Sequence, residues 1–143
     1  MKYSVDELLK SGLLRKIPKS KQRAKESIRT AEAWLKEAEN GFQSGSLRSC
    51  VLVSYLAMFH AARAILFADG FREKSHFAVA RYLENRYVDK GLLEEKWVKL
   101  LDHHREMRHQ DQYSTSFFTT EEEVGNTLDS AKKFVERMSK LLE

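Results

Sequence analysis

Arginine and histidine side chains gather near the end of one helical stripe in the sequence. Trp97 and Leu101 begin an apolar face, and His104 and Arg108 continue it in steps of three and four residues. Ionisable side chains are rarely buried without partners, so this break in the apolar pattern indicates a functional site. The neighbouring side chains that could act with it are Arg105, His109 and Tyr113.

The chemistry available to this cluster is phosphate binding and proton transfer. Arginine stays charged and binds phosphate through two parallel hydrogen bonds, so Arg108 suits a phosphate group. Histidine suits proton transfer near neutral pH. The structural alternative is that Arg108 pairs with a carboxylate such as Asp111. In that case His104, and His60 on another apolar segment, would be hydrogen-bonded core residues.

Positive charge is concentrated near the N-terminus. The segment 10–29 contains eight Lys or Arg residues and one acidic residue, a charge of +7 in a chain whose net charge is +4. Cations at the start of a helix oppose the helix dipole, and a phosphate-bearing partner would offset that cost. Lys21 and Arg23 are therefore candidate contacts to an RNA backbone. The alternative is a solvated loop and helix face.

Two Glu-x-x-His pairs raise the alternative of a metal enzyme. Glu73 with His76, and Glu106 with His109, have the ligand spacing of di-iron helix bundles. Glu73 falls in a predicted loop and Glu106 does not continue the apolar stripe, so we expect no metal site. The sequence has no glycine-rich phosphate loop, and we expect no cofactor.

The elements that position these residues are predicted to be helices. Apolar side chains recur in steps of three and four residues in five segments, and Ser, Thr and Gly residues mark the ends of most of them. A capping box at Ser4 predicts a further short helix that ends at Gly12. The five predicted helices span 20–42, 46–68, 76–89, 93–112 and 120–142.

These helix lengths predict an all-α fold, an antiparallel up-and-down bundle of four long helices plus a shorter one. One proline and six glycines are too few for a many-stranded sheet. We assign residues 1–19 to a short helix and basic linker and residues 20–143 to the bundle. The Ser- and Thr-rich segment 113–119 is predicted to be a loop.

Composition also bears on the compartment. Cys50 is the only cysteine, so an intramolecular disulfide is impossible and a reducing compartment fits. The first ten residues lack the apolar run of a secretory signal. The apolar stretch 51–67 is interrupted by polar side chains, and we expect it to be too short and too polar to span a membrane. These features predict a cytoplasmic protein.

Three groups of residues together resemble a known family. They are Tyr55-x3-Phe59-His60-Ala61-Ala62-Arg63-Ala64, Lys74-Ser75-His76 and Arg105-x2-Arg108-x4-Tyr113. Over roughly residues 20–142 the chain resembles the HEPN family (higher eukaryotes and prokaryotes nucleotide-binding), in its subfamily of small stand-alone archaeal and bacterial proteins. The resemblance implies a helical bundle, a homodimer, and pairing with a minimal nucleotidyltransferase in a toxin–antitoxin module.

The resemblance also implies site residues. Active members of the family are metal-independent ribonucleases whose motif is an Arg, a polar residue and, further along, a His. Arg108 and His109 match the first two positions, whereas Tyr113 occupies the place of the His. Tyrosine is a poor base at neutral pH, so we expect ribonuclease activity to be weak or lost. RNA or a nucleotide would be held by Arg105, His104, His60 and Tyr55, and the alternative is a non-catalytic dimeric interaction module.

Overall fold

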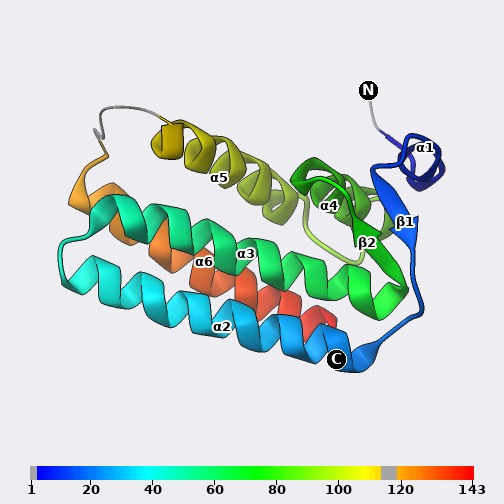
Figure 1. Ribbon diagram of the computed structural model, residues 1–143, viewed down its shortest axis with the longest axis horizontal. Coiled ribbons are helices and arrows are strands. Elements are labelled where there is room, and N and C mark those ends of the chain that lie inside the picture. Colours follow the sequence, from blue (N-terminus) through cyan, green and yellow to red (C-terminus); the bar gives the residue numbers. More distant parts are fainter. Residues whose placement is uncertain (1–2, 114–118) are drawn as a thin grey trace.

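The computed structural model describes residues 3–113 and 119–143 and forms a helical bundle, as predicted (Figure 1). Four long helices and a shorter one make up the bundle, with a small two-stranded sheet at one end (Figure 1). The elements are α1 (Val5–Lys10), β1 (Leu14–Lys16), α2 (Lys21–Gln43), α3 (Leu47–Asp69), β2 (Phe71–Glu73), α4 (His76–Leu83), the π-helix η1 (Glu84–Val88), α5 (Glu95–Tyr113) and α6 (Glu121–Leu141).

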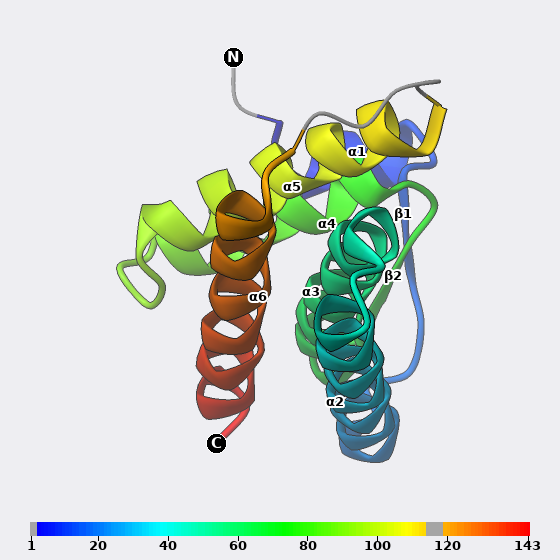
Figure 2. The same ribbon diagram turned by 90° about the vertical axis from the view of Figure 1, so that its left-hand side faces the viewer.

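Helix α3 is the central element because its neighbours cover most of its surface. It contacts α2, α4, α5 and α6, and Figure 2 shows α2 and α6 beside it with α5 crossing above. By length and composition α3 could cross a membrane, so the expectation that this segment is too short was wrong. However, 72% of its most apolar window is buried in the fold, which is typical of the core helix of a soluble protein.

The ends of the helices follow the predicted capping residues. Side chains of Ser20, Ser75 and Thr120 accept hydrogen bonds from backbone N–H groups in the first turns of α2, α4 and α6. Gly70 ends α3 with a φ of 89°. The predicted helix 76–89 is not a single α-helix, because α4 ends at Leu83 and continues as η1. Tyr113 lies in α5 rather than in the predicted loop, and residues 114–118 are outside the described part of the chain.

The two strands were not predicted by the sequence analysis, which assigned them to a linker and a loop. They pair antiparallel with Arg15 opposite Arg72. Leu14 and Phe71 are buried and pack with the core, which draws the two short segments together. The strand pair thus holds the segment before α2 against the segment that leads into α4.

Candidate functional site

Aromatic and histidine rings from α3 and α4 stack at the centre of the site. The ring centroids of Phe59 and His76 are 3.9 Å apart, and the two rings are nearly parallel. The Tyr55 ring stacks on His76 with 5.7 Å between centroids and lies at a tilt to Phe59 at 6.3 Å. The Tyr55 hydroxyl lies 2.9 Å from Nδ1 of His76. Tyr55 and Phe59 are one turn apart on α3, and Ser75 caps α4 so that His76 is its first residue. The local helix geometry therefore fixes all three rings.

Electrostatics set the protonation states of Tyr55 and His76. Burial, together with the nearby guanidinium groups of Arg108, Arg63 and Arg105, lowers the pKa of His76 to about 4. Burial also raises the pKa of Tyr55 to about 12, and the field of Arg108 opposes this increase. At neutral pH the imidazole is therefore neutral and the phenol is protonated. A neutral imidazole has one donor and one acceptor nitrogen, so the direction of the hydrogen bond between the Tyr55 hydroxyl and Nδ1 depends on the tautomer of His76.

Arg108 covers this stack from α5. Its guanidinium carbon lies 5.2 Å from the centre of the Tyr55 ring, and its Nη1 donates to Gln112 at 3.1 Å. Its Nε is buried and has no hydrogen-bond partner within the described residues. The structural alternative, an Arg108–Asp111 ion pair, is not among the contacts of the described residues. Arg108 thus keeps donor capacity next to the aromatic stack.

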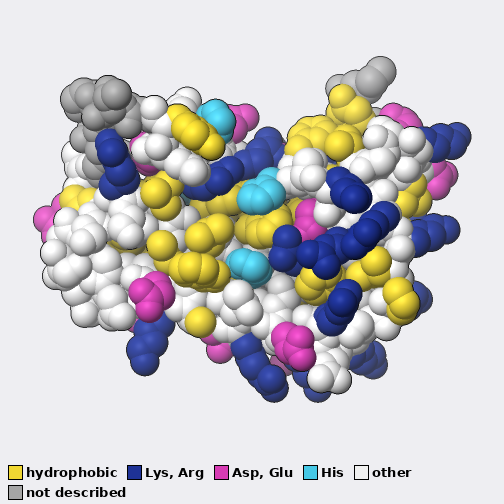
Figure 3. Space-filling model, in the orientation of Figure 1, with side chains coloured by type: hydrophobic (Ala, Val, Ile, Leu, Met, Phe, Trp, Pro, Cys, Tyr) yellow, Lys and Arg dark blue, Asp and Glu magenta, His cyan; other side chains and the backbone are white. Residues whose placement is uncertain are grey.

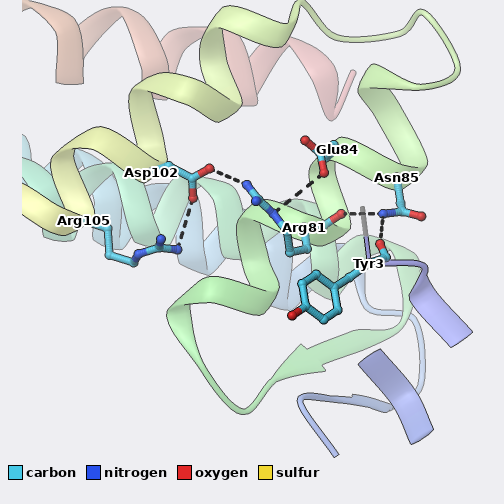
Figure 4. Close-up of polar contacts among 6 residues, drawn as sticks. All are labelled: Tyr3, Arg81, Glu84, Asn85, Asp102 and Arg105. Carbon is cyan, nitrogen blue, oxygen red and sulfur yellow. Dashed lines mark hydrogen bonds and ion pairs between the residues drawn. The ribbon is translucent and has the colours of Figure 1, made fainter. Parts of the chain in front are cut away.

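Arg105, one turn earlier on α5, is held by a polar network with α4 (Figure 4). Asp102 accepts a hydrogen bond from Arg81 and lies 3.1 Å from Nη1 of Arg105. The Arg105 contact is an ion pair without hydrogen-bond alignment. The guanidinium groups of Arg81 and Arg105 also lie 5.3 and 5.7 Å from the Phe77 ring centre. One carboxylate therefore orients two arginines, and Arg105 can still turn toward a ligand.

The histidines predicted from sequence occupy different places. His60 is half-buried on α3, and burial together with Arg63 lowers its pKa. His104 is buried, with Nδ1 unpaired among the described residues, and burial lowers its pKa to about 4. The rings of His60 and Phe59 pack edge to face with 5.7 Å between their centroids, so His60 borders the site. His104 instead lies on the buried face of α5.

His109 and Tyr113 lie at the exposed end of α5. Their rings are 4.8 Å apart, and Tyr113 is 70% exposed. Neither side chain contacts the Tyr55–His76 pair. A shallow hollow of about 340 Å³ lies between Arg105, Arg108 and His109 and links the two parts of the site.

Lys21 and Arg23 separate at the start of α2. Lys21 lines a hollow beside the C-terminus with Asp69 and Tyr87. Arg23 lies 5.8 Å from the ring of Phe67 on α3 and is exposed. Figure 3 shows His side chains among hydrophobic ones on the face that α3 fills, with Lys and Arg side chains on both sides. Arg23 joins this face, and Lys21 does not contact it.

The two Glu-x-x-His pairs do not converge. Glu73 is buried and forms an ion pair with Arg63. Across residues 3–113 and 119–143, no group of three or more His, Cys, Asp or Glu side chains is placed to hold a metal ion. The carboxylate of Glu73 instead fixes a guanidinium group beside the aromatic stack.

Three residues of the site were absent from the predicted site. Phe59 was quoted only as part of the resemblance, His76 was quoted there and in the metal-ligand spacing with Glu73, and Arg63 was not assigned a role. Arg63 lies 4.7 Å from the Phe59 ring and 5.8 Å from the Phe67 ring. The signal that could have identified it is the four-residue spacing of Tyr55, Phe59, Arg63 and Phe67.

Comparison with known proteins identifies the family. The HEPN domain model matches residues 24–141, which is most of the chain. The chain belongs to the HEPN family. A HEPN relative from Methanocaldococcus jannaschii, named as a candidate toxin, is 30% identical over 116 residues, which cover 81% of this chain and 86% of the relative.

Two further archaeal relatives match shorter stretches of this HEPN chain. A UPF0332 protein of Pyrococcus horikoshii is 33% identical over 78 residues, which cover 54% of this chain and 55% of the relative. A UPF0332 protein of Archaeoglobus fulgidus is 33% identical over 73 residues, covering 51% and 58% respectively. The family and these relatives agree with the resemblance carried by the three groups of motif residues.

Proposed function

We propose that this HEPN protein binds RNA at the site formed by Tyr55, Phe59, His76 and Arg108. The observation that carries the proposal is the guanidinium group of Arg108 above the Tyr55 ring, beside the stacked rings of Phe59 and His76. RNA is recognised by cations that bind its phosphates and by flat side chains on which its bases stack. Arg108 supplies the cation from the end of α5, and the half-buried ring of His76 at the start of α4 supplies the flat surface, backed by the buried rings of Tyr55 and Phe59.

Cleavage at this site is proposed to be slow. Arg108 can stabilise a phosphate, but the matched base of the family motif is replaced by Tyr113. His76 is neutral, yet its Nδ1 is already hydrogen-bonded to the Tyr55 hydroxyl. The histidine that remains next to Arg108 is His109, which lines the same hollow but does not occupy the motif position of the base. Binding should survive this arrangement better than catalysis.

We further propose a homodimer that pairs through the outer stripe of α3. The half-buried positions of this helix recur in steps of four, four and three, at Leu52, Leu56, His60 and Arg63. A second copy would cover the two leucines and bring two sets of the stacked rings to one groove, because a two-fold interface repeats each contact. Leu52 and Leu56 are the apolar half of the stripe, and His60 and Arg63 are the polar half.

The biological setting proposed here is a cytoplasmic toxin–antitoxin pair. The relative named as a candidate toxin supports an antitoxin partner for this chain. The family resemblance supports a minimal nucleotidyltransferase as that partner. Its gene would be expected next to the gene for this protein.

The experiment measures binding of a labelled single-stranded RNA by fluorescence anisotropy in EDTA. Arg108→Ala should weaken binding about tenfold or more, because charge-assisted hydrogen bonds to phosphate are lost. Lys99→Ala is the matched control, since Lys99 lies on the same helix. Its only ion pair within the described residues is with Glu95, one turn earlier on the exposed surface of α5. Equal affinities of wild type and Arg108→Ala would contradict the proposal. Binding without any cleavage would favour the non-catalytic interaction module over a ribonuclease.

A further inference from the structure

Arg63 places a second guanidinium group beside the proposed RNA site. It lies on α3 one turn after Phe59, and its guanidinium carbon is 4.7 Å from the centre of the Phe59 ring. The His76 ring is stacked on that same ring with 3.9 Å between centroids, and the charge of Arg63 contributes to the low pKa of His76. Arg63 therefore borders His76 from α3, as Arg108 does from α5.

Glu73 on β2 fixes the orientation of the Arg63 guanidinium group. Nε of Arg63 donates to Oε1 of Glu73, whose side chain is 3% exposed. Arginine has five N–H donors, and four of them are on the two terminal nitrogens. Those four form no hydrogen bond with any residue in the ranges 3–113 and 119–143. The Arg63 side chain is 23% exposed, so these donors can reach a ligand.

The geometry of this ion pair differs from that of a pair that satisfies only its own members. Oε2 of Glu73 is buried and has no hydrogen-bond partner in the described part of the chain. A fork-to-fork contact would satisfy both carboxylate oxygens and occupy two nitrogens of the arginine. Binding through Nε instead leaves the edge between Nη1 and Nη2 open, and that edge can bind a phosphate through two parallel hydrogen bonds.

The two guanidinium groups lie over neighbouring rings of α3. Arg63 lies over Phe59, and Arg108 lies over Tyr55 at 5.2 Å. The Tyr55 and Phe59 ring centroids are 6.3 Å apart, which is about one turn of the helix. A ligand that binds both cations therefore needs two anionic groups separated by about one turn. The phosphates of neighbouring nucleotides meet this requirement, whereas the directly linked phosphates of pyrophosphate are closer together.

We propose that Arg63, positioned by Glu73, binds a second phosphate at the RNA site, so that the site takes an RNA segment with two consecutive phosphates. This inference rests on the proposed function. Arg108 binds one phosphate and Arg63 binds the next one along the strand. The nucleotide between them lies against the half-buried ring of His76, which an acidic peptide would leave without a stacking partner. Glu73 is a positioning residue, because it acts through Arg63.

The first test compares RNAs with one and two phosphates by fluorescence anisotropy in EDTA. The probes are a labelled dinucleoside monophosphate and a labelled trinucleoside diphosphate of uridine. Arg63→Gln should weaken binding of the longer probe about tenfold and change that of the shorter probe less than about twofold. The slope of log affinity against log salt for the longer probe should fall by about 0.7. Arg29→Gln is the matched control, because Arg29 is exposed on α2.

The second test examines Glu73 and gives opposite signs for two explanations. Glu73→Leu removes a negative charge beside the site, so an effect of net charge alone would tighten RNA binding. Loss of positioning should instead weaken binding of the longer probe about fivefold, with no further loss when Glu73→Leu is added to Arg63→Gln. The double variant leaves no buried charge unpaired, so it also tests Arg63 if either single variant fails to fold in thermal unfolding.

The outcomes separate this inference from the proposed function. If Arg108→Ala weakens both probes and Arg63→Gln weakens neither or weakens both equally, the second phosphate contact is wrong and the site at Arg108 stands. If Arg108→Ala weakens neither probe, the proposed function fails. Tighter binding by Glu73→Leu would overturn the positioning role. Pyrophosphate or a glutamate tetrapeptide that displaces the longer probe as well as unlabelled RNA does would overturn the assignment to consecutive RNA phosphates.

Discussion

The Tyr55 hydroxyl lies 2.9 Å from Nδ1 of His76, so a residue of α3 is hydrogen-bonded to the first residue of α4. The phenol is protonated and the imidazole is neutral, and a hydroxyl that donates to Nδ1 would hold the ring proton of His76 on Nε2. The same bond keeps the His76 ring parallel to Phe59. The contact between Tyr55 and His76 therefore positions both the N–H donor and the stacking face of the His76 ring.

Removing this hydroxyl should release His76 without removing the aromatic surface. Tyr55→Phe is expected to lower the free energy of unfolding by about 1 kcal/mol and to weaken RNA binding less than Arg108→Ala does. Nitrogen NMR of the imidazole should show a mixture of tautomers in place of one. Tyr82→Phe is the control, because Tyr82 lies away from the site. Its hydroxyl donates a hydrogen bond of 2.7 Å to Asp69. An unchanged His76 tautomer in Tyr55→Phe would refute the role of the hydroxyl.

Stability should fall as the solution becomes acidic. His104 and His76 have pKa values of about 4 in the folded protein against 6.5 for the free side chain. Between these values the unfolded chain binds more protons, so the free energy of unfolding decreases as the pH drops from about 6.5 to about 4. One histidine contributes at most about 1.4 kcal/mol per pH unit. Urea unfolding at several pH values measures the slope.

The pH slope can be assigned to a residue by substitution. His104→Leu removes the buried imidazole and should flatten the dependence of stability on pH. His103→Leu is the matched control, since His103 is the exposed neighbour on α5. A slope that is the same in both variants and in the wild type would rule out His104 as a contributor.

Tyr113 provides the sharpest test of catalysis. The wild type should cleave single-stranded RNA slowly or not at all in EDTA, and Tyr113→His should raise the rate by a measurable part of the ~10²–10⁴ that general-base catalysis supplies. The side chain is 70% exposed, so the substitution should not disturb the fold. Adding Arg108→Ala should remove the gain. If the wild type cleaves well and Tyr113→His lowers the rate, the missing base is wrongly assigned, and His109, which lines the hollow beside Arg108, becomes the candidate.

The proposed homodimer can be separated from RNA binding. Leu56→Glu places a charge in the apolar half of the α3 stripe and should convert a dimer to a monomer at micromolar concentration, because a buried unpaired carboxylate is costly. Light scattering measures the mass. Leu92→Glu is the control at an exposed leucine outside the α3 stripe. A monomeric wild type would refute the dimer.

Gly70 should tolerate substitution less well than Gly91, although both have a positive φ angle of similar size. Gly70 has a φ of 89°, and an added Cβ would lie 2.9 Å from the carbonyl oxygen of Ile17. Gly91 has a φ of 73°, and a Cβ there would meet nothing within 4 Å. Gly91→Ala should therefore cost about 1 kcal/mol for the left-handed backbone alone, and Gly70→Ala about 2 kcal/mol or more. Equal losses in thermal unfolding would show that the contact with Ile17 is unimportant.

The helices could be predicted from sequence because their stripes and caps are local signals. The strands could not, because each has three residues and the pair places Arg15 opposite Arg72, against the usual preference for cross-strand neighbours. The π-helix η1 was also missed. Its backbone pattern has no simple sequence period, whereas the α4 segment before it does.

The site was only partly predictable for the same reason. Arg105 and Arg108 were identified because they interrupt an apolar stripe on one helix. Their distance from Tyr55 and His76 depends on how α5 packs over α3, which no local pattern encodes. Arg72 reaches Phe67 only through the unpredicted strand pair. His104 was correctly placed on the apolar face, and the structure shows that this face is buried.

A site whose side chains are all carried by helices has a kinetic consequence. The hydrogen-bonded backbones of α3, α4 and α5 hold Tyr55, His76 and Arg108, so no loop has to become ordered before these side chains are in place. Ligand capture should then be limited by diffusion and accelerated by the positive charge of Arg105 and Arg108, and the association rate should fall as salt rises. Differences in affinity among RNA sequences should accordingly appear in how slowly each one leaves.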